Sequence, residues 1–310
     1  MRQPMAVIKT WIDSHVHASD ITVNGKKKPD FMKHLIDVLD RSEVDLRLIL
    51  NCDAIEMPAM LENAQALMDG NRFIHQTVSG APGRLYGSCM VNPHHLDFSL
   101  RTMEECFEKF NFVMLGEMLQ YMMGYKMNSD NVERLVKQAV QYDVPVHVHI
   151  STSNAKTHPS TFGTDQLIDL LGLAERVPEA KYILAHLVGH EKNDPPIVDE
   201  YLDVIKKYSR AWPENFWVEI RDFNSPGLKS VLNRVPHGRI LSGTDYCTQR
   251  GPPFNDYGTL DLNANAPNGE QPLKLTINEM VGCMERFGAT ADTVAKIAYK
   301  NALSLFKQAH

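Results

Sequence analysis

The 310-residue sequence has no apolar run of about 18 residues, the length that a helix needs to cross a bilayer, so we expect no membrane span. Positive charge is not in excess either. The 32 lysines and arginines are outnumbered by 38 aspartates and glutamates, and the formal net charge is −6. Because nucleic-acid-binding proteins usually carry a basic face, we expect no nucleic-acid partner.

Cysteine is scarce and follows no disulfide or metal-binding pattern. There are five cysteines, an odd number, and no two of them form a CxxC pair. This argues against a disulfide framework and against a thiolate zinc site, and it fits a reducing compartment. The first ten residues also lack an apolar segment followed by a small-residue cleavage site. Together these absences predict a cytoplasmic protein.

Short apolar runs alternate with amphipathic stretches along the chain. The runs predict eight strands, at residues 9–12, 46–51, 85–91, 112–116, 145–150, 182–185, 216–220 and 239–241. Between them apolar residues recur at helical spacing, as in Phe31, Leu35, Val38 and Leu39. Eight strand–helix units of about 39 residues each predict an α/β protein of the (β/α)8 TIM-barrel class.

An open, doubly wound parallel sheet is the alternative fold, but no glycine-rich phosphate loop follows any predicted strand. No repeat or linker divides the chain, so we expect one domain over residues 1–310. The stretch at about 249–273 follows the last strand and is rich in Gly, Pro, Asn and Asp. Its length and composition predict a lid or specificity loop.

Two histidines that are two residues apart, His15 and His17, follow the first predicted strand. On an extended chain alternate side chains point to the same face, so both imidazoles could bind one divalent ion. Two surface histidines in a loop are the alternative, because an HxH pattern often arises by chance.

Further histidines lie in the fifth and sixth predicted strands. His147 and His149 share one face of the fifth strand, and His149 is nearer the carboxyl end, where a barrel places its active site. His147 would then lie deeper, as a hydrogen-bonded core residue. His186 ends the sixth strand, and a hydrogen-bonded core histidine is the alternative for it.

Two carboxylates also follow apolar strands, Glu117 after the fourth and Asp245 after the eighth. A carboxylate in such a place is costly to bury unless it is paired or bound to a cation. A solvated side chain is the alternative for Glu117, and a helix N-cap is the alternative for Asp245.

In a barrel the carboxyl ends of all these strands meet at one mouth. The expected metal ligands are His15, His17, Glu117, His149, His186 and Asp245. Imidazole and carboxylate ligands without thiolate are typical of catalytic metal sites. Zinc is the favoured ion, manganese and iron suit the same ligands, and we expect one or two ions.

Two residues near the mouth are candidates for binding substrate. Arg221 ends the seventh strand, where its guanidinium could bind a carboxylate, and an ion pair with Glu219 or Asp222 is the alternative. Tyr246 follows Asp245 and could line the substrate pocket, with packing as the alternative.

The HxH motif, the histidines that end strands five and six, and the run Gly243-Thr-Asp-Tyr246 resemble the amidohydrolase superfamily. The run Pro145-Val-His-Val-His-Ile-Ser151 and the closing Asn301-Ala-Leu-Ser-Leu-Phe306 resemble its amidohydrolase-related branch. That branch includes metal-dependent hydrolases, lactonases and nonoxidative decarboxylases such as the resorcylate enzymes. The similarity covers essentially the whole chain.

This resemblance implies roles for the candidate residues. It implies that one metal ion is bound by His15, His17, His149 and Asp245. His186 matches a histidine that binds a second metal in binuclear members and is catalytic in mononuclear ones. Glu117 matches a carboxylate that bridges two ions in TatD-like hydrolases.

We therefore expect a metal-dependent hydrolase of a C–O or C–N bond in a small-molecule lactone, ester or amide. The cation would activate water, with Asp245 transferring protons and His186 stabilising the oxyanion. A nonoxidative decarboxylase of a small carboxylic acid and a non-catalytic binding barrel are the alternatives. A homodimer is expected only because it is the commonest assembly among soluble oligomers.

Overall fold

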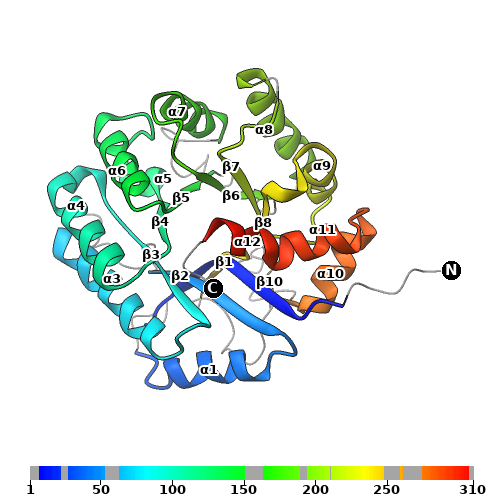
Figure 1. Cartoon of the computed structure of the whole chain (residues 1–310), viewed down its shortest axis with the longest axis horizontal. Coiled ribbons are helices and arrows are strands. Elements are labelled where there is room, and N and C mark those ends of the chain that lie inside the picture. The colour runs from blue at the N-terminus through cyan, green and yellow to red at the C-terminus, as the bar shows by residue number, and fades with distance from the viewer. Residues whose placement is uncertain are drawn as a thin grey trace, which may run out of the picture.

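The computed structural model describes residues 7–21, 27–52, 63–150, 163–188, 194–209, 211–247, 259–260 and 274–306. Eight parallel strands form a nearly closed barrel with helices between them (Figure 1), which confirms the predicted (β/α)8 class. The strands are β1 (Thr10–Ala18), β2 (Asp45–Cys52), β3 (Leu85–Cys89), β4 (Met114–Met118), β5 (Val146–His149), β6 (Tyr182–Val188), β7 (Phe216–Ile220) and β8 (Ile240–Ser242). Each strand pairs with its neighbour in sequence order.

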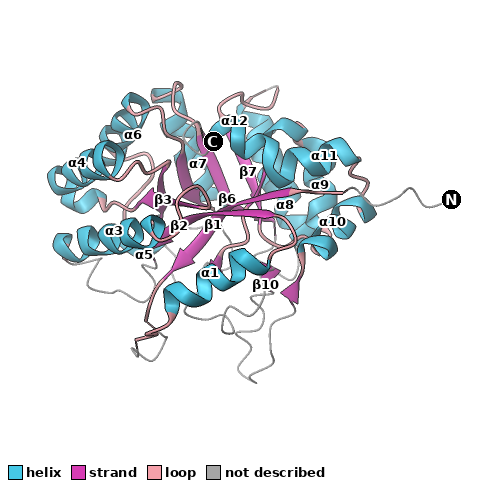
Figure 2. Ribbon diagram, turned by 60° about the horizontal axis from the view of Figure 1, so that its bottom comes forward, coloured by secondary structure: helices cyan, strands magenta, loops and turns pink. Residues whose placement is uncertain are grey.

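The helices lie on the outside of the strands, as Figure 2 shows. They are α1 (Phe31–Arg41), α3 (Ala64–Ser79), α4 (Leu96–Glu104), α5 (Gln120–Met123), α6 (Asp130–Gln141), α7 (Gly163–Arg176), α8 (Asp194–Tyr208), α9 (Gly227–Arg234), α10 (Ile277–Arg286), α11 (Ala291–Ala295) and α12 (Asn301–Leu305). Each long helix buries one face, because apolar residues recur at helical spacing. In α6, for example, Val132, Leu135, Val136 and Ala139 are buried.

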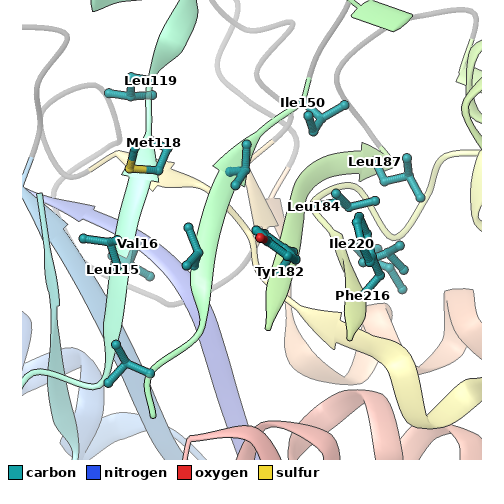
Figure 3. Packing of buried hydrophobic residues seen from close by; sticks show 14 of the residues in the cluster. Val16, Leu115, Met118, Leu119, Ile150, Tyr182, Leu184, Leu187, Phe216 and Ile220 are labelled. Atoms are coloured by element: carbon teal, nitrogen blue, oxygen red, sulfur yellow. The ribbon is translucent and has the colours of Figure 1, made fainter. Parts of the chain in front are cut away.

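Alternate side chains of the strands build two separate apolar layers. The inner layer fills the barrel with Ile12, Ile49, Tyr86, Val113, Met114, Ile183, Trp217 and Leu241, and it includes Leu305 and Phe306 from the end of the chain. The outer layer joins the strands to the helices. Figure 3 shows part of it, with Leu115, Leu184 and Phe216 among the side chains. The polar residues of the strands therefore gather at the carboxyl ends of the strands, beyond the inner layer.

The first strand is longer than predicted. It was expected at residues 9–12, but β1 continues to Ala18 and pairs there with two other strands. Its residue His17 is in register with Asn51 of β2 and with Cys247 of the two-residue strand β9 (Tyr246–Cys247). His17 is therefore held between two strands, while His15 lies in the same strand at the irregular stretch between Asp13 and Val16.

Buried polar contacts join the first strand to the segment after β8. The Ser14 hydroxyl donates to the Ser242 carbonyl at 2.8 Å. The Asp13 carboxylate accepts from the backbone N–H of His15 at 2.9 Å and from that of Thr244 at 3.0 Å. It also accepts from the Thr244 hydroxyl. Asp13 thereby fixes the position of the HxH segment relative to the segment that carries Asp245.

The expected lid at about 249–273 lies outside the described residues, except for β10 (Thr259–Leu260), which pairs with β11 (Lys274–Leu275). Among the described cysteines, four are free buried thiols: Cys52, Cys89, Cys106 and Cys283. None of the helices in the described ranges combines the length and the hydropathy that a bilayer crossing requires.

Replacing Thr244 with Val should destabilise the barrel, because the buried Asp13 carboxylate then loses a hydroxyl donor. A hydrogen bond to a charged group contributes about 1.5–3 kcal/mol, and we expect a loss of that order in chemical denaturation. Thr77→Val is the matched control, since the buried Thr77 hydroxyl donates only to the Phe73 carbonyl of its own helix. Equal losses in the two variants would contradict this role of Asp13.

Candidate metal centre

The six expected metal ligands meet at the carboxyl end of the barrel. His15, His17, Glu117, His149 and His186 come from β1, β4, β5 and β6, and Asp245 lies between β8 and β9. None of the six is more than 8% exposed. Strand pairing is irregular at three of the positions, because the register shifts between Asp13 and Val16, between Leu115 and Met118, and between Leu184 and Val188. Such bulges change the direction of a side chain, and they are common beside active sites.

Four of the donor atoms lie close enough to bind one cation. We call them the primary donor group: His15 Nε2, His17 Nε2, Glu117 Oε2 and Asp245 Oδ1. The two imidazole nitrogens are 2.9 Å apart, and each lies 3.2 Å from Glu117 Oε2. Asp245 Oδ1 lies 3.5 Å from His15 Nε2 and 3.2 Å from His17 Nε2. Ligand bonds of 2.0–2.2 Å around one ion separate neighbouring donors by about 2.8–3.6 Å, so the contacts of the two imidazoles with each carboxylate are compatible with a shared divalent ion.

The second carboxylate oxygen of Glu117 faces a different pair of histidines. Glu117 Oε1 lies 2.8 Å from His149 Nδ1 and 2.9 Å from His186 Nε2. We call these three atoms the secondary donor group. His186 also approaches Asp245, with 3.6 Å between Nδ1 and Oδ2. The single side chain of Glu117 therefore connects two sets of donor atoms.

Carboxylates outnumber the fixed positive charges among the described side chains of this buried region. Glu117, Asp245 and Glu219 place three carboxylates here, and Arg221 is the one basic side chain that contacts them among the described residues, apart from histidines. With neutral histidines the sum of these four groups is minus two. One divalent ion would cancel that charge, and buried uncompensated charge is strongly unfavourable.

The pKa values show how the same imbalance acts on the histidines when no metal is bound. Burial by itself would lower the pKa of His15, but Glu219 and Glu117 raise it well above its ordinary value. Burial also opposes the charged form of His17, yet hydrogen bonds to Asp245 and Glu117 raise its pKa to about 10. Protons on these two imidazoles therefore compete with a metal ion for the primary donor group.

His186 and Asp245, the two expected catalytic residues, behave differently. Burial lowers the pKa of His186 to about 4, although the carboxylate of Asp245 opposes this shift, so His186 is neutral near pH 7. Burial would raise the pKa of Asp245, but His186 and Arg221 lower it well below its ordinary value. Both residues adopt positive φ angles, +60° and +53°, which non-glycine residues rarely adopt and which occur most often at functional sites.

The two expected substrate-binding residues have different surroundings. The Arg221 side chain is buried, and its Nε lies 3.1 Å from Asp245 Oδ2, so it points toward the primary donor group. The alternative for Arg221 is an ion pair with Glu219 or Asp222, and of these Glu219 has both of its oxygens in contact with histidines. Tyr246 is in register with Val16 and packs with it in the outer apolar layer. A contact of Tyr246 with substrate stays a prediction.

Two polar residues of the mouth were missed by sequence reasoning. Glu219 in β7 is completely buried and contacts His15 and His147. Asn51 is also completely buried and is in register with His17, and within the described part of the chain neither atom of its amide has a hydrogen-bond partner. Strand alternation could have predicted both residues, because side chains two positions apart share a face of a strand. Glu219 lies two residues after Trp217, and Asn51 lies two residues after Ile49, and both Trp217 and Ile49 belong to the inner layer.

Residues 12–308 match the family model described as Amidohydrolase. No curated protein matches the sequence at a significant level. Among solved structures, a dihydroxybenzoic acid decarboxylase from Polaromonas sp. JS666, with bound manganese and the inhibitor 2-nitroresorcinol, has a TM-score of 0.64 and 17% identity and covers 98% of both chains.

Two further solved structures are similar over nearly their whole length. A protein described as an amidohydrolase from Staphylococcus aureus has a TM-score of 0.67 and 14% identity, covering 96% of this chain and 99% of its own. A 2,6-dihydroxybenzoate decarboxylase from Rhizobium has a TM-score of 0.63 and 15% identity, covering 97% of this chain and 99% of its own. At these identities the likeness establishes the fold, and the donor atoms described above support a divalent metal.

Binding of Mn²⁺ to the metal-free protein should release protons. His17, with a pKa of about 10, carries a proton at pH 7, and a metal ligand must be unprotonated. The affinity for Mn²⁺ should therefore rise as the pH rises from 6 to 8. Calorimetric titration in buffers of different ionisation enthalpy measures the protons released, and a heat of binding that does not depend on the buffer would contradict this expectation.

Proposed function

The chain belongs to the amidohydrolase family of metal-dependent enzymes, and from this premise we propose that it decarboxylates a small carboxylic acid without an oxidant. The sequence favoured hydrolysis and kept decarboxylation as the alternative. The comparisons support the alternative better, because the similar structures from Polaromonas and Rhizobium are decarboxylases of dihydroxybenzoates. We propose manganese rather than zinc as the ion, since the Polaromonas structure contains manganese.

One geometric observation carries the proposal: the His15 and His17 imidazoles both lie within ligand distance of a Glu117 oxygen and of an Asp245 oxygen, so one cation could be held without His186. The four donors come from His15, His17, Glu117 and Asp245. His186 lies beside them, neutral near pH 7, with Nδ1 3.6 Å from Asp245 Oδ2. A neutral imidazole next to a carboxylate is suited to proton transfer. His186 is therefore assigned the catalytic role rather than a ligand role.

The reaction needs a cationic anchor for the substrate and a proton for its carbon atom. A divalent cation on the primary donor group would stabilise the negative charge that develops as carbon dioxide leaves. Arg221 would orient the substrate through an oxygen of its carboxylate or of a neighbouring group. The bond between the carbon skeleton and the carboxyl group breaks and leaves its electron pair on carbon. His186, with Asp245, delivers a proton from solvent to that carbon, so one proton is consumed for each carbon dioxide released.

Hydrolysis of a C–O or C–N bond is the second candidate, and one specific observation favours it. The two oxygens of Glu117 face the primary and the secondary donor groups separately. A carboxylate in that position can bridge two ions, and two-ion sites commonly activate water for hydrolysis. In that case His186 and His149 would be ligands of the second ion.

Substrate assays and metal counting distinguish the two candidates. The protein is stripped of metal, reloaded with Mn²⁺ or Zn²⁺, and assayed against hydroxybenzoates such as 2,6-dihydroxybenzoate and against lactones, esters and amides. Release of carbon dioxide with about one ion per chain supports the proposal. Hydrolysis with about two ions per chain refutes it and supports the second candidate.

The variant Glu117→Gln tests, without a substrate, whether Glu117 bridges two ions. If the site binds one ion, His15, His17 and Asp245 still supply three donors, so the variant should keep about one ion per chain with weaker affinity. If it binds two ions, the loss of the bridging carboxylate should reduce the count from two to one or fewer. Elemental analysis of the dialysed protein gives the count.

Asn51→Leu tests whether the buried amide beside His17 contacts substrate. Ile49 faces the barrel interior, so Asn51, two residues later, faces it as well. An unsatisfied buried polar group costs about 1–3 kcal/mol, and Leu at this position should not lower the stability of the metal-free protein. It should raise KM for the substrate found in the assays above.

The comparison variant is Asn71→Leu. The buried Asn71 amide makes three hydrogen bonds, to Leu67 and Met90, so this replacement should lower stability. A KM for Asn51→Leu equal to that of the unmodified protein would contradict the substrate contact.

A further inference from the structure

A completely buried glutamate lies behind the primary donor group. Glu219, one residue before the carboxyl end of β7, accepts a hydrogen bond from His15 Nδ1 on Oε1 and another from His147 Nε2 on Oε2, both at 2.7 Å. His15 belongs to β1 and His147 to β5, so Glu219 connects three strands across the interior of the barrel. His147 is also completely buried and lies two residues before His149 on the same face of its strand.

The contact with His15 determines which nitrogen of that imidazole carries the proton. A carboxylate only accepts hydrogen bonds, so Nδ1 of His15 must donate. In a neutral ring the lone pair is then on Nε2, the atom that lies in the primary donor group. A carboxylate bound to the far nitrogen also makes an imidazole a stronger ligand and fixes the plane of its ring.

The neighbouring strand leaves space for this carboxylate through a glycine. A Cβ atom added to Gly243 would lie 2.2 Å from both Cγ and Cδ of Glu219 and 2.6 Å from its Oε2. Real Cβ atoms essentially never come so close to other atoms. The φ of Gly243 is not in the positive range, so the missing side chain, rather than an unusual backbone angle, is what this position requires.

A structural role alone accounts poorly for a charge at this position. Burying a carboxylate in a barrel is costly, and an apolar residue of similar volume commonly packs as well or better. Glu219 is buried together with the metal-site side chains and adds to their negative charge, which a divalent ion would balance. The contact of Glu219 with His15 therefore explains the buried charge better than packing does.

We propose that Glu219 and Gly243 act together as a positioning pair that sets the affinity of the primary donor group for its divalent ion. Glu219 orients His15 and increases its basicity, and Gly243 keeps the space that the Glu219 side chain occupies. The inference rests on the proposed function only in that the site binds a divalent cation. It holds for decarboxylation and for hydrolysis alike.

The test measures Mn²⁺ binding directly, with Mn²⁺ alone as the probe and free Mn²⁺ determined by electron paramagnetic resonance. Glu219→Gln keeps the shape of the side chain and removes its charge, and Gly243→Ala adds the Cβ that displaces it. Loss of such a supporting contact commonly costs 10–100-fold in metal affinity, and we expect a loss in that range for each variant. The melting temperature in EDTA should stay close to that of the unmodified protein for Glu219→Gln.

Matched controls separate a specific effect from a general one. Glu133→Gln changes a carboxylate of α6 that also has two partners, Lys137 and Arg176, but lies on an outer helix. Gly282→Ala adds a Cβ in α10 where no atom lies within 4 Å. Both controls should bind Mn²⁺ with the affinity of the unmodified protein.

Unchanged Mn²⁺ affinity in Glu219→Gln would overturn the inference while leaving the proposed function intact. If Glu219→Gln does not fold, the Mn²⁺ affinity of Gly243→Ala is used instead, and an unchanged affinity in that variant would overturn the inference. If the unmodified protein binds neither Mn²⁺ nor Zn²⁺, the proposed function fails and this inference fails with it.

Discussion

The mouth of the barrel depends on an excess of negative charge that is buried away from water. Three carboxylates, Glu117, Asp245 and Glu219, lie within contact distance of imidazoles, and Arg221 supplies the fixed positive charge that contacts them among the residues that the structure describes. A divalent ion resolves this imbalance, and protons on His15 and His17 do so when the ion is absent. Metal binding, protonation and the stability of the site are therefore linked through one electrostatic requirement.

The scaffold keeps this charged group in place through contacts between distant segments. Asp13 joins the HxH segment to Thr244, and Glu219 joins His15 to His147. These are buried contacts with good geometry, and they add to the rigidity that the barrel provides. A catalytic site gains from such support, because donors held in position need no reorganisation when substrate or metal binds.

Glu117 is the residue on which the choice of chemistry depends. One of its oxygens completes the primary donor group, and the other contacts His149 and His186. A single ion leaves His186 for proton transfer, whereas a second ion would use it as a ligand. The same six side chains are compatible with decarboxylation or hydrolysis, and a second bound ion would favour hydrolysis.

The sequence by itself determined the fold class, and it predicted which six side chains would meet at the mouth of the barrel, because both depend on local patterns. Strand–helix alternation predicts a barrel, and a barrel brings every strand end to one mouth, so His15 and Asp245 could be expected together although 230 positions separate them. Alternation along the fifth strand likewise predicted a deep His147 beneath His149. The length of β1 was underestimated, because its extension depends on partners in β2 and β9.

Only the tertiary structure decided how these side chains divide between donor groups. The bulges at His15, Glu117 and His186 change side-chain directions, and they arise from pairing between strands rather than from local sequence. The proposed pairing of Glu219 with Gly243 also required the tertiary structure, because the close approach of these two residues depends on how β7 lies beside β8. The direction of Arg221 toward Asp245 and the packing of Tyr246 with Val16 were decided in the same way, by long-range register.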